Sequence, residues 1–368
     1  MHVIATRETI LAAVAPLLTI AQRGMKASQN VLSVRSLQNG TLQFTCSDDN
    51  AVMTTTAAAE SVGSVAFAAA AKRFHEVFRS LPSGSKVEIK ADDANLLIAH
   101  GGSRFKLNTA SIPEPLSRAG NVGDSSGEFS IGSDEFGYLL GVAQHAVHES
   151  MNPNIPSGIL LHMTGDRLRL IGTNGGRMAV SSAAVSSPEA KIVLSSNAVA
   201  DIKSLITKSP DGDVLKFSWK DGVISVSCAG AVYQAGITFS TPLDYERVLN
   251  NTKIVTFHVG LDNVRSIVSR MLIVSSAITL RLSGRTMTVA TEIGEGKKKG
   301  EECSESFEIP EDAKQVDEFQ VTVNGRFLMD ALGAVRGEPV HLSYVSGGPL
   351  VILASGGEAR VYVMPLRV

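Results

Sequence analysis

One pattern recurs along the entire 368-residue chain: a strand, a helix and then about three further strands. We find six copies, with predicted helices at 7–22, 71–81, 133–147, 197–207, 262–271 and 325–335. Because each copy has an apolar face that it cannot bury alone, neighbouring copies must pack together. The repeat therefore predicts an α+β fold of tandem β-α-β-β-β units, in which each helix covers one face of a sheet.

The helix and strand predictions depend on two periods. Between residues 166 and 172, Leu168 and Leu170 alternate with Arg167 and Arg169, as in a strand with one buried and one solvated face. The predicted helices instead repeat apolar residues every three or four positions, which gives each one an apolar stripe. Examples of such stripes are Ile10, Val14 and Leu17 in the first helix, and Phe74, Val77, Phe78 and Leu81 in the second.

Taken in pairs, the units predict three similar domains, at 1–124, 125–251 and 252–368. Polar, turn-rich stretches lie near 122–127 and 250–252, where these domains would meet.

Charge and cysteine content narrow the class of protein. The chain has 34 Lys and Arg against 36 Asp and Glu, a net charge of −2, so nucleic acid could be attracted only by locally concentrated cations. Three cysteines without a C-x-x-C pair suit a reducing cytoplasm better than a disulfide or a zinc site. No apolar run reaches the roughly 18 to 20 residues that span a bilayer, and no leader peptide is expected. We expect a soluble, cytoplasmic protein.

The predicted helices carry cations on their solvent sides, whereas acidic residues gather in loops. If the helices share one surface, that surface would attract a phosphate backbone without reading its sequence. The alternative, that these cations form only a solvated face, stays open. The cations are Arg7, Arg23, Lys26, Lys72, Arg73, Arg79, Lys203, Lys208, Arg265, Arg270, Arg326 and Arg336.

Catalytic chemistry has no support in the sequence. The stretch 294–300 (GEGKKKG) has the wrong spacing for a phosphate-binding loop. His145, His148 and Glu149 follow the order H-x-x-H-E, not the H-E-x-x-H of zinc enzymes, and no carboxylate pair stands out. We predict a protein that is not an enzyme and needs no cofactor and no metal. A hydrolase would need a cluster of His, Ser and Asp, which we do not find.

Three segments, together with the repeat, resemble the bacterial DNA sliding clamp, the beta subunit of DNA polymerase III. They are 362–368 (YVMPLRV), 173–180 (TNGGRMAV) and 242–249 (PLDYERVL), and weaker matches lie at 104–109 and 81–84. The resemblance covers essentially the whole chain in length and in the order of its repeats. It implies three clamp-type domains in a head-to-tail dimeric ring, with helices inside and sheets outside.

The resemblance also implies a processivity factor: a homodimer that encircles duplex DNA regardless of sequence, is loaded by a clamp loader and tethers the replicative polymerase. At the joint between subunits it implies Phe105 and Leu107 on one side, with Leu272 and Ile273 on the other. The residues implied to face DNA are Arg23, Lys26, Lys72, Arg73, Arg79, Arg104 and Lys203.

Clamps of this family bind a short peptide of the polymerase, the clamp loader and repair polymerases in a pocket between the second and third domains. Met, Val, Leu and Pro would make an adaptable apolar slot, while Arg and backbone groups would fix the polar ends of the peptide. By matching motif, its walls here are Pro156, Thr173, Gly175, Arg177, Met178, Pro242, Arg247, Val248, Pro349, Met364, Pro365, Leu366, Arg367 and Val368. Without the resemblance, the last segment would be interpreted simply as a final strand.

Two segments depart from the family's pattern. The chain has Asn174-Gly-Gly-Arg-Met178 where the family commonly has D-G-H-R-L, so a histidine at the rim of the pocket is replaced by Gly176 and a different peptide preference is expected. Residues 24–31 lack the usual proline-rich approach to the second strand, which bears on the DNA contacts of Arg23 and Lys26. A divergent or secondary clamp is one interpretation; a competing one is a monomeric repeat protein whose pocket takes a small ligand or peptide, without a DNA role.

Overall fold

The structure is a computed structural model of the chain. It describes residues 2–23, 30–37, 40–62, 65–92, 94–112, 126–147, 157–208, 212–237, 244–250, 255–291, 301–310, 318–344 and 348–366. Of the predicted site residues, Lys26, Pro156, Pro242, Arg367 and Val368 lie outside the described residues, as do His148 and Glu149 and the stretch 294–300.

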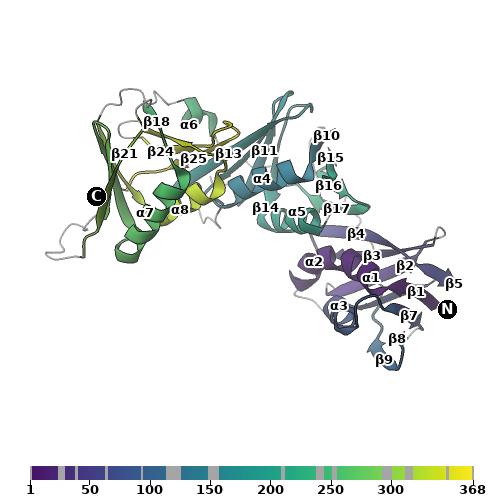
Figure 1. Cartoon of the computed structure of the whole chain (residues 1–368). Coiled ribbons are helices and arrows are strands. Elements are labelled where there is room, and N and C mark those ends of the chain that lie inside the picture. Colours follow the sequence, from purple (N-terminus) through teal and green to yellow (C-terminus); the bar gives the residue numbers. More distant parts are fainter. Residues whose placement is uncertain are drawn as a thin grey trace. The chain divides into compact units, whose positions relative to one another are not determined.

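All six predicted units are present, each with a strand, a helical segment and three strands (Figure 1). The first two are β1 (His2–Thr6), α1 (Arg7–Val14), α2 (Leu18–Arg23), β2 (Val31–Ser36), β3 (Thr41–Ser47), β4 (Ala51–Ala58); and β6 (Ala66–Ala70), α3 (Ala71–Ser80), β7 (Lys86–Ala91), β8 (Asn95–His100), β9 (Ser103–Asn108). The next two are β10 (Gly127–Gly132), α4 (Ser133–Gln144), β11 (Gly158–Met163), β12 (Arg167–Thr173), β13 (Arg177–Ala184); and β14 (Ala190–Ser195), α5 (Ser196–Lys208), β15 (Val214–Lys220), β16 (Val223–Cys228), β17 (Ala231–Gly236). The last two are β18 (Val255–Val259), α7 (Leu261–Val274), β19 (Ala277–Ser283), β20 (Thr286–Thr291), β21 (Ser304–Glu308); and β22 (Phe319–Asn324), α8 (Gly325–Ala334), β23 (Val340–Tyr344), β24 (Leu350–Leu353), β25 (Ala359–Val363).

The structure adds three elements that periodicity did not predict. A 3-10 turn (Ala15–Leu17) divides the predicted first helix at Pro16, because proline has no N–H to donate and its ring clashes with the preceding turn. The other two are a short strand, β5 (Glu60–Val62), and a one-turn helix, α6 (Glu246–Asn250). Both are too short to show a period.

Within each pair, the two units exchange their first strands. The strand before each helix pairs antiparallel with the first strand after the helix of the companion unit, as in β1 with β7 and β6 with β2. The same exchange occurs for β10 with β15, β14 with β11, β18 with β23 and β22 with β19. This reciprocal pairing explains why a single unit is not an independent fold.

Two further pairings join one pair of units to the next. In the first joint β17 pairs with β4, and in the second joint β25 pairs with β13. Each joint produces a continuous sheet of eight strands, whereas the remaining sheets have five strands, ending on β9, and four strands, ending on β21.

Contacts within the chain cluster into two compact units, 1–137 with 197–238, and 138–196 with 239–368. These compact units cross the predicted domain boundaries, because each eight-stranded sheet combines strands from two predicted domains. The division into three domains stays a prediction.

In each compact unit, helices and sheets share an apolar core. In the first unit α1 packs against α3, and Ile10, Val14, Phe74 and Phe78 are fully buried. In the second, α7 packs against α8 over a large cluster that includes Val268, Leu280 and Leu332 (Figure 1). In the part of the chain that the structure describes, no helix is long and apolar enough to cross a membrane. Cys46, Cys228 and Cys303 form no disulfide.

Candidate partner-binding and DNA-facing surfaces

The eight-stranded sheet of the second joint buries side chains on both of its faces. On β13, Ala179 belongs to the main core, whereas Met178 and Val180 point to the opposite face, as strand alternation requires. There they join a second cluster, which consists of Leu160, Ile171, Met178, Val180, Val193, Tyr245, Val351 and Tyr362. One member of the second cluster, Met178, is among the residues predicted for the partner pocket.

Tyr245 and α6 cover part of the second cluster. The Tyr245 side chain is 1% exposed, and Val248 and Leu249 pack beside it. A hydrogen bond of 2.5 Å joins the Tyr245 hydroxyl to Nδ1 of His162, and Arg169 donates to the same hydroxyl at 3.4 Å. Burial raises the pKa of Tyr245, and burial together with Lys191 lowers the pKa of His162, so both groups are neutral near pH 7.

A tight turn between β12 and β13 forms another side of this region. The Asn174 side chain accepts hydrogen bonds from the backbone N–H groups of Gly176 and Arg177, both at 3.0 Å, and Gly175 has a φ of +86°. This is an Asx turn, in which glycine supplies the left-handed conformation without strain. The Thr173 hydroxyl completes the turn by donating to the Arg177 carbonyl at 2.8 Å.

Gly176 occupies the position where the family pattern has histidine, and α8 lies directly against it. A Cβ atom on Gly176 would come within 3.0 Å of the Phe327 ring. The Arg177 guanidinium stacks on the same ring at 4.4 Å and binds the Asp330 carboxylate at 2.5 Å. The Arg177 side chain is only 11% exposed, so most of it is covered by the protein.

The C-terminal segment places two apolar side chains in solvent near this turn. Met364 donates its N–H to the Gly176 carbonyl, and Leu366 donates to the Thr322 carbonyl. These backbone bonds fix the segment, yet the side chains of Met364 and Leu366 stay 42% and 40% exposed. Exposed large apolar side chains beside an apolar cluster are typical of a surface that binds a partner.

The predicted DNA-facing cations separate into two groups. Lys72, Arg73 and Arg79 are exposed on α3, whose opposite side buries Phe74 and Phe78. Arg104 and Lys203 are also exposed, on β9 and α5. Arg23 differs, because its guanidinium binds Asp201 at 2.7 Å and Asp48 at 3.0 Å. With two carboxylates around it, Arg23 is a structural cation of the first joint and not a free phosphate contact.

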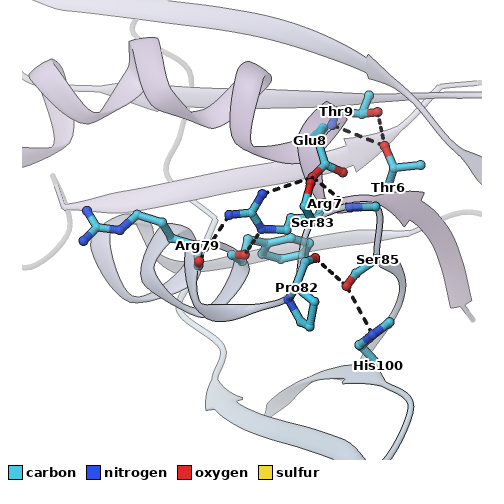
Figure 2. A network of polar contacts seen from close by, with 11 residues as sticks. Thr6, Arg7, Glu8, Thr9, Arg79, Pro82, Ser83, Ser85 and His100 are labelled. Carbon is cyan, nitrogen blue, oxygen red and sulfur yellow. Dashed lines mark hydrogen bonds and ion pairs between the residues drawn. The ribbon is translucent and has the colours of Figure 1, made fainter.

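Arg7 also serves the fold, as Figure 2 shows. Its guanidinium donates to the carbonyl groups of Phe78 and Arg79 at the end of α3, and to the Glu8 carboxylate at 3.0 Å. A cation is favourable there, since the carbonyls at a helix C-terminus have no partners within the helix. In contrast, the Arg79 side chain points away from this network (Figure 2).

Known proteins share this architecture. Residues 1–114 match the family described as DNA polymerase III beta subunit, N-terminal domain. The chain is 25% identical to the beta sliding clamps of Proteus mirabilis and Pseudomonas aeruginosa, over 81% of this chain and 80% of each relative. A crystal structure of the Pseudomonas aeruginosa sliding clamp bound to griselimycin has a TM-score of 0.88 at 20% identity and covers 100% of both chains. The first third of the chain matches the beta-subunit family, and the whole chain has the fold of beta sliding clamps.

The structure brings together some of the residues that the sequence predicted for a peptide pocket. Thr173, Gly175, Arg177 and Met178 lie in or beside the Asx turn, and Met364 is tied to that turn through Gly176. Val248 packs on the second cluster, Arg247 is exposed and Pro349 is half-buried next to Leu350 of β24. Pro365 forms an isolated bridge with Val323.

Several contributors were missed from the sequence: Phe327, Asp330, Asp201, His162 and the burial of Tyr245. Two of these, Asp201 and Asp330, could have been found by aligning the repeats. Each is the sixth residue of its helix, α5 or α8. Each binds an arginine that comes from across its joint.

Proposed function

We propose that this protein is a processivity factor: two copies close head to tail into a ring around duplex DNA and tether the replicative polymerase and other replication and repair proteins. Its similarity to beta sliding clamps points to a protein that is not an enzyme. A ring need not bind DNA tightly if it cannot leave it, so its role is mechanical. The proposal places the protein with the chromosome, in the cytoplasm, and requires a clamp loader to open the ring.

The main support for the ring is that two edge strands, β9 and β21, take part in neither joint. Each joint pairs the last strand of a first unit, β4 or β13, with the last strand of a second unit, β17 or β25. By this rule β21 and β9 should also pair, yet they end separate sheets. Pairing β21 with β9 of a second copy completes the pattern and removes both exposed edges.

The side chains at these edges suit such an interface. Phe105 and Leu107 on β9 are only half-buried. At the end of α7, Leu272 is partly buried against the core, whereas Ile273 is 84% exposed. These four residues are the apolar contacts that we propose for the subunit joint, since apolar side chains at such exposure are stabilised by a covering partner.

The exposed cations of α3 support weak contact with DNA. Lys72, Arg73 and Arg79 stand on one helix without a carboxylate in its first turn. Such cations attract phosphates regardless of base sequence, and the attraction weakens with salt, which suits sliding.

For partner proteins, we propose that Met364 and Leu366, the second cluster and the Asx turn take an apolar peptide. The solved Pseudomonas aeruginosa clamp bound to griselimycin indicates that this fold can hold a ligand. With Arg177 bound to Asp330, backbone groups and Arg247 are left to fix the polar ends of the peptide.

Retention on DNA tests the ring directly. After loading by a clamp loader and ATP, the protein should stay on covalently closed circular DNA and leave linearised DNA through its ends. Light scattering should give the mass of a dimer at micromolar concentration. Equal loss from circular and linear DNA, or a stable monomer, would favour the competing repeat protein without a DNA role.

A further inference from the structure

The helix α6 is too short to keep its position by itself. It has five residues, Glu246–Asn250, and the N–H groups of Val248 and Leu249 donate to the Tyr245 carbonyl at 3.0 and 3.1 Å. A helix of one turn is unstable in water, because ordering its backbone costs more than so few hydrogen bonds return. The position of α6 on the sheet therefore depends on its contacts with other elements.

Two consecutive side chains connect α6 to the sheet. Tyr245 enters the second cluster and is 1% exposed, whereas the side chain of Glu246 is 48% exposed. Both reach the same two residues, His162 of β11 and Arg169 of β12, which stand directly opposite each other. The helix is thus attached to the sheet at its N-terminal end.

The Tyr245 hydroxyl is the centre of this attachment. Its oxygen accepts a hydrogen bond from Arg169 at 3.4 Å and lies 2.5 Å from Nδ1 of His162. A guanidinium has no acceptor, so the hydroxyl hydrogen is left for the imidazole. The hydroxyl can therefore satisfy a cation and a neutral histidine at the same time.

The charges around His162 favour this arrangement. His162 stands opposite Lys191 on one side and Arg169 on the other. Burial and these two cations lower the pKa of His162, whereas Glu246 and Glu189 raise it, and the net effect is an imidazole that is neutral near pH 7. The Glu246 carboxylate lies 3.6 Å from Arg169 and 3.9 Å from Nδ1 of His162. The acid of α6 thus faces a row of the sheet with two cations.

The next two residues of α6 belong to the proposed peptide site. Arg247 is exposed, and Val248 packs on the second cluster. They follow Tyr245 in the chain by two and three residues, so any displacement of Tyr245 also displaces them. The contacts of Tyr245 therefore decide where this wall of the site stands.

We propose that His162 is a positioning residue of the peptide site, because it holds the Tyr245 hydroxyl and thereby the first turn of α6. Its contact keeps Arg247 and Val248 in the geometry that receives the peptide of a partner. The inference rests on the proposed peptide site and adds to it a residue of β11 that acts through α6. A wall that is ordered beforehand loses less entropy on binding, so this contact strengthens the binding of the peptide.

Removal of one hydroxyl tests the attachment. Tyr245→Phe keeps the buried ring in the second cluster and removes only the group that His162 holds. Binding of a short clamp-motif peptide from the replicative polymerase, measured by calorimetry, should weaken about three- to tenfold, because one hydrogen bond that orders the wall is lost. The amide hydrogens of Val248 and Leu249 should exchange with solvent faster, since α6 is no longer fixed.

Tyr233→Phe is the matched control. Tyr233 is also 1% exposed, and its hydroxyl is bonded to Asp201 in the other compact unit. The control should destabilise the fold at least as strongly, since the bond that it loses involves a carboxylate. Peptide affinity and the exchange of α6 should nevertheless stay as in the native chain. Equal peptide affinity in the two variants would overturn the proposal, and so would unchanged exchange in Tyr245→Phe.

A double-variant cycle tests whether His162 acts through Tyr245. If the two residues act through one bond, His162→Leu combined with Tyr245→Phe should bind the peptide no more weakly than the weaker single variant. Additive losses would overturn the role of His162 and leave the peptide site intact. A native chain that binds no such peptide would overturn the proposed peptide site, and this inference with it.

Discussion

The Arg23 guanidinium donates two hydrogen bonds to the Asp201 carboxylate, at 2.7 and 2.8 Å, and one to Asp48 at 3.0 Å. Arg23 ends α2 and Asp201 lies in α5, so this contact ties the two sides of the first joint. Asp201 is fully buried, and burial raises its pKa while Arg23 opposes that rise. The neighbouring cation therefore favours the charged form of this buried carboxylate.

Arg23→Met should lower the free energy of unfolding by about 3 kcal/mol, since it leaves a buried carboxylate without its cation. The loss should shrink as the pH falls, because protonation removes the unpaired charge. Urea unfolding measures both effects. Arg79→Met, which removes an exposed arginine of the same compact unit, is the control and should cost less than about 0.5 kcal/mol. An equal loss in the two variants would contradict the role given to Arg23.

Neutralising the α3 cations should weaken binding to DNA. The triple substitution Lys72→Ala, Arg73→Ala and Arg79→Ala removes three exposed charges from one helix. The slope of log affinity against log salt should fall by about 0.9 for each phosphate that the protein no longer neutralises, measured by anisotropy on a short linear duplex. Arg23→Met should leave this slope unchanged, because its charge is already matched by carboxylates.

Glu8 gives a pH dependence with a definite sign. The N–H of Gly84, with Arg7 and Ser83, lowers the pKa of Glu8 from 4.5 to about 2. Since the folded pKa lies below the unfolded value, Glu8 stabilises the fold above about pH 4.5, and that contribution is lost as the pH falls toward 2. The melting temperature of Glu8→Gln should fall less steeply over this interval than that of the native chain. Glu128→Gln is the control; an identical slope in Glu8→Gln and the native chain would refute the prediction.

The exposed C-terminal side chains should bind partners without stabilising the fold. Met364→Ala with Leu366→Ala should weaken binding of a polymerase-derived clamp-motif peptide at least tenfold, by calorimetry, because it removes two apolar side chains from the proposed pocket. The free energy of unfolding should change by less than about 0.5 kcal/mol, since both side chains are about 40% exposed. Val214→Ala, at an exposed valine of the other compact unit, should leave binding unchanged. Unchanged binding in the double variant would remove these residues from the pocket.

Much of the fold was predictable because its signals are local. Alternation in 166–172 and the apolar stripe of 71–81 identify a strand and a helix from adjacent residues alone. Gly176, Met364 and Leu366 were also placed near one site by motif. The carboxylate partners of Arg23 and Arg177 were not predicted from the sequence, because they lie 178 and 153 residues away along the chain.

The sequence by itself determined the kind of repeating unit and the number of its copies. The order of apolar and polar residues shows which segments are strands and which are helices. Only the tertiary structure decided which strands exchange, which edges fuse and which remain open. Those choices depend on backbone hydrogen bonds, which every residue offers alike, and on packing between distant segments. For the same reason, only the folded chain distinguishes an arginine bound to buried Asp201 from one that stays free on α3.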